Sequence, residues 1–187
     1  MILFLKSIRM GDAKMNEMIC LLKSENVQKT IKDVRFFLAD LKYEYPEHEK
    51  WYDGMVQELE SGMNREIIAA YDDRNIIGVA ILKKSNLERK ICSLRVAKEY
   101  QCNGIGTELV KRSFEFLETD KPIITVSQTK KMEFQKLFNY FDFSLERVYH
   151  GKYLPSSSEY CYNGILLPES ILQQNKKQVW EQKVMGI

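Results

Sequence analysis

The sequence is poor in the residues that mark several classes of protein. It has only four prolines and nine glycines among 187 residues, a content too low for a collagen-like or low-complexity chain. Its four cysteines include no C-x-x-C pair, so neither a zinc knuckle nor a redox dithiol is indicated, and reduced thiols are expected. The two histidines, His48 and His150, stand far apart in the sequence. We therefore expect no metal site.

The chain also lacks an excess of one charge and a long hydrophobic run. It has 28 basic and 26 acidic residues, a net charge of +2, so no strong overall field predicts nucleic acid or an anionic membrane as the main partner. The apolar N-terminus soon meets Lys6 and Arg9, which makes it too short for a signal peptide or a membrane span. We expect a cytoplasmic protein, monomeric or homodimeric, with neither membrane nor nucleic acid as a partner.

The residues that are present describe an α/β (α+β) globular protein. Hydrophobic residues make up 44% and charged residues 29%, and the length suits one domain. A short strand is predicted over residues 2–8, followed by helices. Apolar residues recur every three or four positions from Val27 to Leu41, and again from Trp51 to Leu59, which predicts two helices. Pro46 precedes the second helix and Gly62 ends it.

From residue 65 the pattern becomes that of strands. A hairpin over 66–71 and 76–82 and a third strand over 90–96 are expected. A helix from Ile105, a buried strand over 123–126, a helix over 130–140 and a final hairpin over 145–153 and 159–166 follow. Strand, helix and strand between 90 and 126 form a right-handed crossover, which leaves a helix N-terminus at the carboxyl end of the sheet. A last helix is expected over 169–184.

The segment from Leu94 to Thr107 carries the clearest chemical signal. Gly104 and Gly106 stand at the start of a predicted helix, where glycine lets the backbone approach a ligand and unpaired amides favour an anion. The dinucleotide-binding pattern fails because Leu109 stands where a third glycine is required, and no Walker lysine follows. A pyrophosphate site of another kind is the prediction, and a loop with two chance glycines is the alternative.

From position 101 the chain reads Gln101, Cys102, Asn103, Gly104, Ile105 and Gly106. This run resembles the signature of the GNAT superfamily of acetyl-CoA-dependent N-acetyltransferases, which is Gln or Arg, two residues, Gly, one residue, then Gly or Ala. Val96 stands five positions before Gln101, as in the family. The resemblance implies a mixed, mostly antiparallel sheet of about seven strands flanked by helices, with two splayed parallel strands at the cofactor site. The order of elements agrees with the family over roughly residues 2–166, so a GNAT-like domain is expected over 1–166. The tail adds an expected C-terminal helical extension over 167–187 packed on this domain.

The resemblance also implies a function. Main-chain groups of Leu94 and Val96 would bond the pantetheine arm of acetyl-CoA as an added strand, and amides after them would bind its pyrophosphate. The acetyl group would pass to a primary amine of a small molecule or peptide. A non-catalytic acyl-CoA sensor or scaffold is the alternative, and acetylation of a macromolecule such as tRNA is a third hypothesis. The implied cosubstrate-binding residues are Leu94, Val96, Gln101, Cys102, Asn103, Gly104, Ile105, Gly106 and Thr107.

Two departures from the family concern catalysis. The tyrosine that commonly acts as general acid is replaced by Phe138, which cannot donate a proton. The positions that often hold a glutamate base carry Cys92, Ser93 and Arg95, so acid and base stay unassigned. Ser127, at the carboxyl end of its predicted strand, is our candidate for positioning the reacting atoms, with capping of the next helix as its alternative role.

Several other side chains have a structural role as their expected one. Cys92 and Cys102 are expected to be structural thiols, with the role of acyl acceptor as the alternative, because no histidine that could activate them stands nearby in the sequence. Three glutamates are distant candidates for the base and are expected to be solvated surface charges: Glu66, Glu88 and Glu159. A set of aromatic residues is expected to pack, with the wall of a substrate groove as the alternative: Tyr43, Tyr45, Trp51, Tyr52, Tyr149, Tyr153, Tyr160 and Tyr162.

Overall fold

The computed structural model describes residues 6–10, 13–21, 27–62, 64–168, 170–174, 177–178 and 181, with side chains from residue 27 onward. Its strands are β1 (Lys6–Met10), β2 (Ala13–Leu21), β3 (Arg65–Asp72), β4 (Asn75–Lys84), β5 (Arg89–Val96), β6 (Ile123–Ser127), β7 (Leu145–His150) and β8 (Ser158–Tyr162). Its helices are α1 (Val27–Phe37), α2 (His48–Glu60), α3 (Ile105–Leu117) and α4 (Lys131–Tyr140), with short 3₁₀ helices η1 (Ala39–Tyr43) and η2 (Lys98–Tyr100).

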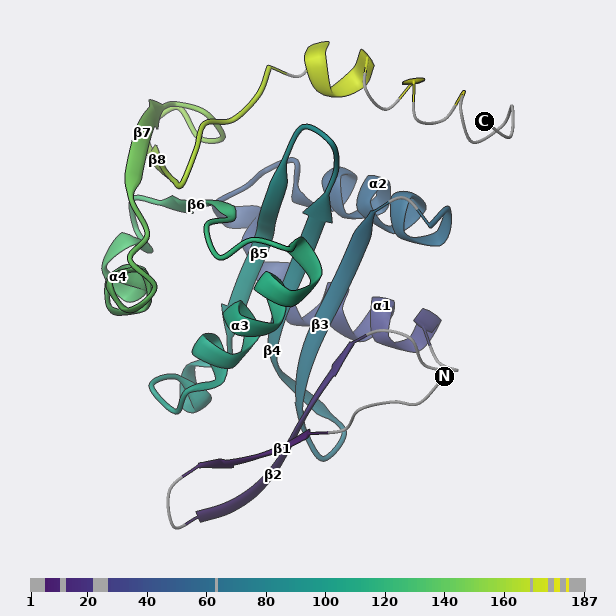
Figure 1. Ribbon diagram of the computed structural model, residues 1–187, viewed down its shortest axis with the longest axis vertical. Helices are drawn as coiled ribbons and strands as arrows, with labels where there is room; N and C mark the ends of the chain where they lie inside the picture. Colours follow the sequence, from purple (N-terminus) through teal and green to yellow (C-terminus); the bar gives the residue numbers. More distant parts are fainter. Residues whose placement is uncertain are drawn as a thin grey trace.

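The eight described strands form one sheet in the order β1-β2-β3-β4-β5-β6-β8-β7. Every neighbouring pair is antiparallel except β5 and β6, which are parallel. Figure 1 shows α3 crossing one face of the sheet, while α1 and α2 lie on the other. The predicted mixed, mostly antiparallel sheet is confirmed.

The sheet has eight strands where about seven were expected, because the N-terminal segment was interpreted incompletely. β2, which was not predicted, pairs with β3 in the register Cys20↔Ala69. Its alanine, methionine, glutamate and leucine residues favour helix locally, and pairing with β3 overrides that preference. The strand expected over 2–8 lies partly outside the described residues, and β1 begins at Lys6. The helix expected over 169–184 also extends outside them, and residues 170–174 are helical.

The helix predicted from Val27 to Leu41 is divided in two. α1 ends at Phe37 and the chain continues as η1, although the predicted inward residues Ile31, Val34 and Leu38 are buried. After the break, Asp40 contacts Arg95 of β5, and Glu44 contacts Ser127 of β6. The segment that was expected to be the end of the helix therefore carries contacts to the sheet.

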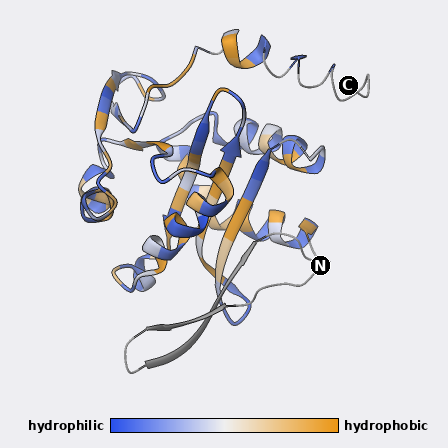
Figure 2. Ribbon diagram, viewed as in Figure 1, coloured by the Kyte–Doolittle hydropathy of each residue, from blue (hydrophilic) through white to orange (hydrophobic). Residues whose placement is uncertain are grey.

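Two hydrophobic cores lie on the two faces of the sheet. Side chains alternate along β3, so that Ile68 packs with Leu109 of α3 in one core, and Ile67 packs with Val34 of α1 in the other. Figure 2 shows hydrophobic residues concentrated in the middle of the central strands. Burying each large aliphatic side chain contributes about 1.5–3 kcal/mol. No helix in the described part of the chain combines the length and hydrophobicity needed to cross a membrane.

The parallel strands β5 and β6 pair over only two positions, Lys90↔Ile123 and Ile91↔Ile124. Beyond Ile91 the register between β4 and β5 shifts, so that Cys92 is an extra residue on β5. Such a bulge bends the strand that carries it. β6 continues beside β8 as far as Ser127, so the last residues of β5 have no partner on the β6 side. The splayed pair that the resemblance implied is present.

Candidate functional site

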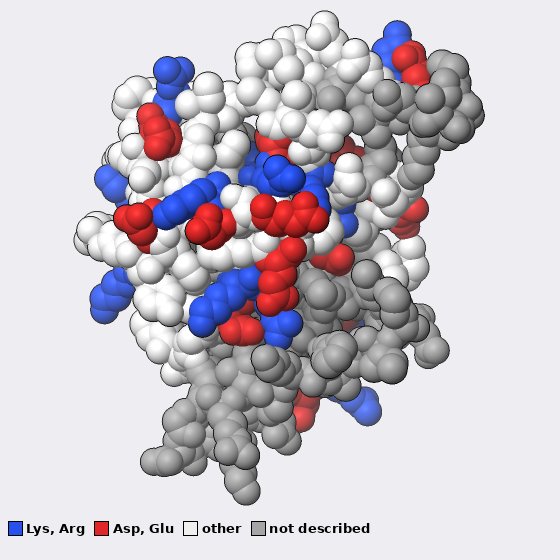
Figure 3. Space-filling model, in the orientation of Figure 1, with Lys and Arg blue, Asp and Glu red and all other residues white. Residues whose placement is uncertain are grey.

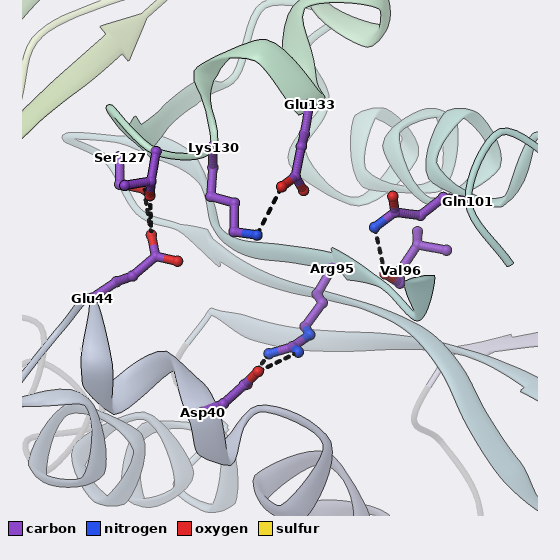
Figure 4. Close-up of polar contacts among 9 residues, drawn as sticks. Asp40, Glu44, Arg95, Val96, Gln101, Ser127, Lys130 and Glu133 are labelled. Carbon is purple, nitrogen blue, oxygen red and sulfur yellow. Dashed lines mark hydrogen bonds and ion pairs between the residues drawn. The ribbon is translucent and has the colours of Figure 1, made fainter. Parts of the chain in front are cut away.

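The free edge of β5 exposes main-chain groups of two predicted residues. The amide of Ala97 donates to Ile77 O at 2.8 Å, so Ala97 and Arg95 face β4. Since alternate residues of an antiparallel strand point to opposite sides, the peptide groups of Leu94 and Val96 face the opening beside β6. The side-chain amide of Gln101 donates to Val96 O at 3.2 Å (Figure 4), which agrees with this direction.

The start of α3 lies directly after that edge. Gly104 has φ +87°, a left-handed conformation that glycine adopts without strain, and a Cβ there would meet nothing within 4 Å. In the described chain, the amides of Ile105, Gly106 and Thr107 donate to no backbone carbonyl, and the first helical bond runs from Glu108 N to Gly104 O at 3.0 Å. Unpaired amides at a helix N-terminus fit the pyrophosphate of a coenzyme.

The two glycine positions differ in their surroundings. A Cβ on Gly106 would lie 3.8 Å from Val96 Cγ2 and 3.9 Å from Leu137 Cδ2. Gly106 thus stands between the end of β5 and α4, on the side of the opening that α3 covers. Cys102 precedes this turn with φ +61° and is exposed. The predicted residues from Gln101 to Thr107 therefore form one continuous bend beside the β5 edge.

On the face of the sheet that α1 and α2 cover, η1 is joined to β5 by a bidentate ion pair. Arg95 Nη2 lies 2.7 Å from Asp40 Oδ2, and Arg95 Nη1 also contacts Asp40 Oδ1 (Figure 4). The hydrogen bond and the charge of Arg95 hold the pKa of the Asp40 carboxyl below its usual range, and Asp40 in turn raises the pKa of the guanidinium. In the sequence, Arg95 was noted only because it stands at a position that often holds the family's glutamate base. In the structure, its side chain joins β5 to η1.

Ser127 is buried at the carboxyl end of β6, with 5% of its surface exposed. Its hydroxyl donates to Glu44 Oε2 and lies 2.9 Å from Thr129 Oγ1, which donates to the same carboxylate oxygen at 3.1 Å. α4 has Lys130 at its N-cap and no side-chain cap bond, so Ser127 is not the cap of that helix. Figure 4 shows Glu44 pointing from the end of η1 toward Ser127.

A pocket of about 290 Å³ opens beside Ser127. It is walled by the end of η1, the segment after β6 and the connection between β7 and β8, with Tyr43, Tyr153 and Glu159 among its lining residues. Two of the aromatic residues considered for a groove thus line this pocket. Tyr52 and Tyr162 instead belong to the two cores.

A sequence model described as "Acetyltransferase (GNAT) domain" matches residues 31–146, which is more than half of the chain. The chain belongs to the GNAT family of acetyltransferases. The resemblance at Gln101 to Gly106 is confirmed at the level of the family. Membership makes the chain an N-acetyltransferase with acetyl-CoA as its cosubstrate.

Solved structures of other proteins share the GNAT fold. A GNAT-family protein from Desulfovibrio desulfuricans has a TM-score of 0.61 and 17% identity, over 77% of this chain and 96% of the other. The IAA acetyltransferase from Bacillus cereus has a TM-score of 0.57 and 15% identity, over 78% and 97%. Arabidopsis thaliana Naa50, in complex with the bisubstrate analogue CoA-Ac-MVNAL, has a TM-score of 0.56 and 16% identity, over 79% and 99%. Identities this low establish the fold alone. No curated protein matches the chain.

The expectation that three glutamates are solvated surface charges is wrong. Glu66, Glu88 and Glu159 have only 7%, 6% and 4% of their surfaces exposed. Glu88 forms an ion pair with Lys83, and Glu66 Oε1 accepts the amide of Ile67 at 3.2 Å. Polar partners within the fold allow these carboxylates to be buried. Of the three, Glu159 lines the pocket.

The position of the usual GNAT tyrosine lies in the core. Phe138 is 2% exposed, and its ring centroid lies 4.4 Å from that of Tyr162 and 5.3 Å from that of Phe134. Asp142, just after α4, has φ +52°, a left-handed conformation that aspartate tolerates better than most residues. Tyr140 is 65% exposed. No hydroxyl from this helix therefore replaces the missing acid.

Proposed function

We propose that this chain transfers the acetyl group of acetyl-CoA to a primary amine of a small molecule or a peptide. The observation that carries the proposal is the continuous path from the free edge of β5 to the unpaired amides at the start of α3. An extended arm pairs with such an edge, and a pyrophosphate binds such amides. Membership of the GNAT family supplies the reaction class.

The residues of this path have distinct roles in the proposal. Main-chain groups of Leu94 and Val96 bond the pantetheine arm, so the bond from Gln101 to Val96 O exchanges for one to the ligand. The amides from Cys102 to Thr107 bind the pyrophosphate, as the family signature implies, while the amide of Gln101 already donates to Lys98 O at 3.3 Å. The thioester then lies between β5 and β6, where Ser127 reaches it from the carboxyl end of β6 and helps to position the reacting atoms.

The acceptor enters through the pocket beside Ser127, on the face of the sheet opposite to α3. Glu44 and Glu159 both line it, so a carboxylate is available to attract an ammonium group. The hydroxyl bonds that Ser127 and Thr129 give to Glu44 keep that carboxylate directed at the end of β6. These features support an amine acceptor over a hydroxyl or thiol acceptor.

The proposal is tested with purified protein, acetyl-CoA and an amine panel of spermidine, tyramine, L-lysine and a peptide with a free N-terminus. Release of CoA thiol and a mass gain of one acetyl group on an amine are expected. Gly106→Val should weaken acetyl-CoA binding about tenfold or more in calorimetry, because the branched side chain enters the gap between Val96 and Leu137. Gly54→Val is the matched control, since nothing lies within 4 Å of a Cβ at Gly54.

A non-catalytic acyl-CoA sensor is the second candidate, and the core position of Phe138 favours it, because no tyrosine of α4 can protonate the thiolate. The two functions differ in one result. A sensor binds acetyl-CoA with the same dependence on Gly106 but releases no thiol with any amine of the panel. Turnover of one amine excludes the sensor. Such turnover is compatible with Phe138, because a CoA thiolate is a good enough leaving group to depart without an acid.

Other expectations stay predictions. They are a cytoplasmic location, a monomer or homodimer, and packing of residues 167–187 on the domain. On the face drawn in Figure 3, basic and acidic side chains are interspersed. This distribution supports the expectation that nucleic acid is not a partner, because binding to phosphates favours a patch of one sign.

A further inference from the structure

Glu159 occupies a distinctive place in the pocket. It lies on β8 directly across from Ser127 of β6, so the two residues are one strand spacing apart, about 4.8 Å. It is buried, yet it lines the pocket that opens beside Ser127. Its side chain is therefore within direct reach, or reach through one water, of a group bound where β6 ends.

The surroundings of Glu159 favour a carboxylate that can exchange a proton. The Tyr45 hydroxyl donates to Glu159 Oε1 at 3.2 Å. Burial raises the pKa of Glu159, while hydrogen bonds from Thr125 and Tyr45 and the charge of Lys90 lower it in part. A carboxylate whose pKa is raised binds a proton more readily than an exposed one, which suits it to general base catalysis. The ionisable groups around it come from every segment that packs on it: Tyr45 and Glu44 at the end of η1, Lys90 of β5, Tyr153 of the β7–β8 connection and Cys161 of β8.

The second carboxylate of the pocket has a different environment. One oxygen of Glu44 accepts hydroxyl bonds from both Ser127 and Thr129. Glu44 belongs to the chain just after η1, where it is half-buried. Two carboxylates in unlike environments take different roles at an active site. Glu44 is suited to holding Ser127 and attracting the ammonium, and Glu159 is suited to removing a proton.

We propose that Glu159 is the general base that takes the proton from the acceptor ammonium. This inference rests on the proposed acetyl transfer. The ammonium gives one proton to the Glu159 carboxylate, and the neutral amine attacks the thioester carbon. An N–C bond forms while the C–S bond breaks, with its electron pair leaving on sulfur. The second amine proton leaves with the sulfur as the CoA thiol, and Glu159 returns its proton to water.

The test compares Glu159→Gln with Glu88→Gln. Glutamine keeps the size of Glu159 and an oxygen that accepts the Tyr45 hydroxyl, but it takes no proton. Glu88 is an equally buried glutamate, paired with Lys83 outside the pocket, so its variant controls for loss of a buried carboxylate. Melting curves and acetyl-CoA binding show whether each variant is folded. The rate is measured with the best acceptor of the amine panel between about pH 6 and pH 9.

General base catalysis is worth about 10²–10⁴-fold. We expect kcat/KM of Glu159→Gln to fall by about 100-fold or more at pH 7. The variant's rate should then rise about tenfold per pH unit, because it depends on the small fraction of amine that is already neutral. With aminoacetonitrile, a weakly basic amine that is mostly neutral at about pH 7, the loss should shrink to within about threefold. Glu88→Gln should keep the wild-type pH profile.

The outcomes separate this inference from the reaction itself. Absence of thiol release by the wild-type protein with every amine contradicts the proposed transfer. If the wild type acetylates an amine and Glu159→Gln matches its rate and pH profile, Glu159 is not the base. A folded variant that is equally slow with both amines, without the rise with pH, overturns the inference too, because it indicates a structural defect.

Discussion

Gly78 of β4 lies against the first turns of α3. An added Cβ would lie 3.0 Å from Ile105 Cγ2, 3.1 Å from Leu109 Cδ1 and 3.4 Å from Arg95 O. Carbon atoms in good contact are about 3.5–4.0 Å apart, so Gly78→Ala forces α3 to move by a few tenths of an ångström. Overpacking costs about 1–3 kcal/mol, and the smaller entropy of the unfolded alanine chain offsets about 0.4–1 kcal/mol.

The net loss of about 1 kcal/mol lowers the melting temperature by about 2–4 °C in a domain of this size. Because Ile105 begins the turn whose amides are free, the shift should also weaken acetyl-CoA binding by about threefold to tenfold. Thermal unfolding and calorimetry measure the two effects. Gly54→Ala in α2 is the control, where nothing lies within 4 Å of the new Cβ and a gain of about 0.5–1 kcal/mol is expected. A Gly78→Ala protein as stable and as tight-binding as the wild type refutes the packing argument.

The effects of three further substitutions follow from the surroundings of the residue that each one replaces. Phe138→Tyr adds a hydroxyl among buried rings and should cost about 1–3 kcal/mol in denaturant unfolding, while an increase in kcat would contradict the core position. His48 is buried with no hydrogen-bond partner for either ring nitrogen in the described chain, and burial lowers its pKa. Because the pKa of His48 is lower in the folded protein than in the unfolded chain, its contribution to stability is present above about pH 6.5 and is lost as the pH falls. His48→Phe should remove that loss, and melting curves that stay equally pH-dependent would count against it. Asp40→Asn breaks an exposed ion pair with Arg95 and should lower the free energy of unfolding by at most about 1 kcal/mol. Because the pKa of Asp40 is lowered in the folded protein, the difference in stability between wild type and variant is present above about pH 4 and should vanish in urea unfolding at lower pH.

Much of the fold follows from local sequence patterns. The strands β3 to β6 and the helices α2, α3 and α4 begin and end close to the predicted positions, because periodicity and turn residues act over a few neighbouring positions. The signature beginning at Gln101 identified the family for the same reason. Its glycines form the bend beside β5 within one short stretch of chain.

The acceptor side depends on tertiary contacts that local patterns do not contain. Buried Glu159 accepts a hydrogen bond from Tyr45, which is 114 residues away in the sequence. The Ser127 hydroxyl donates to Glu44, which is 83 residues away in the sequence. β2 is a strand because it pairs with the edge of β3. The sequence by itself therefore determined the family, the bend from Gln101 to Thr107 and most element boundaries, all of which rest on near neighbours. Only the tertiary structure decided which carboxylates line the pocket and how deeply each is buried, because the free energy of a charge depends on every segment that excludes water from it.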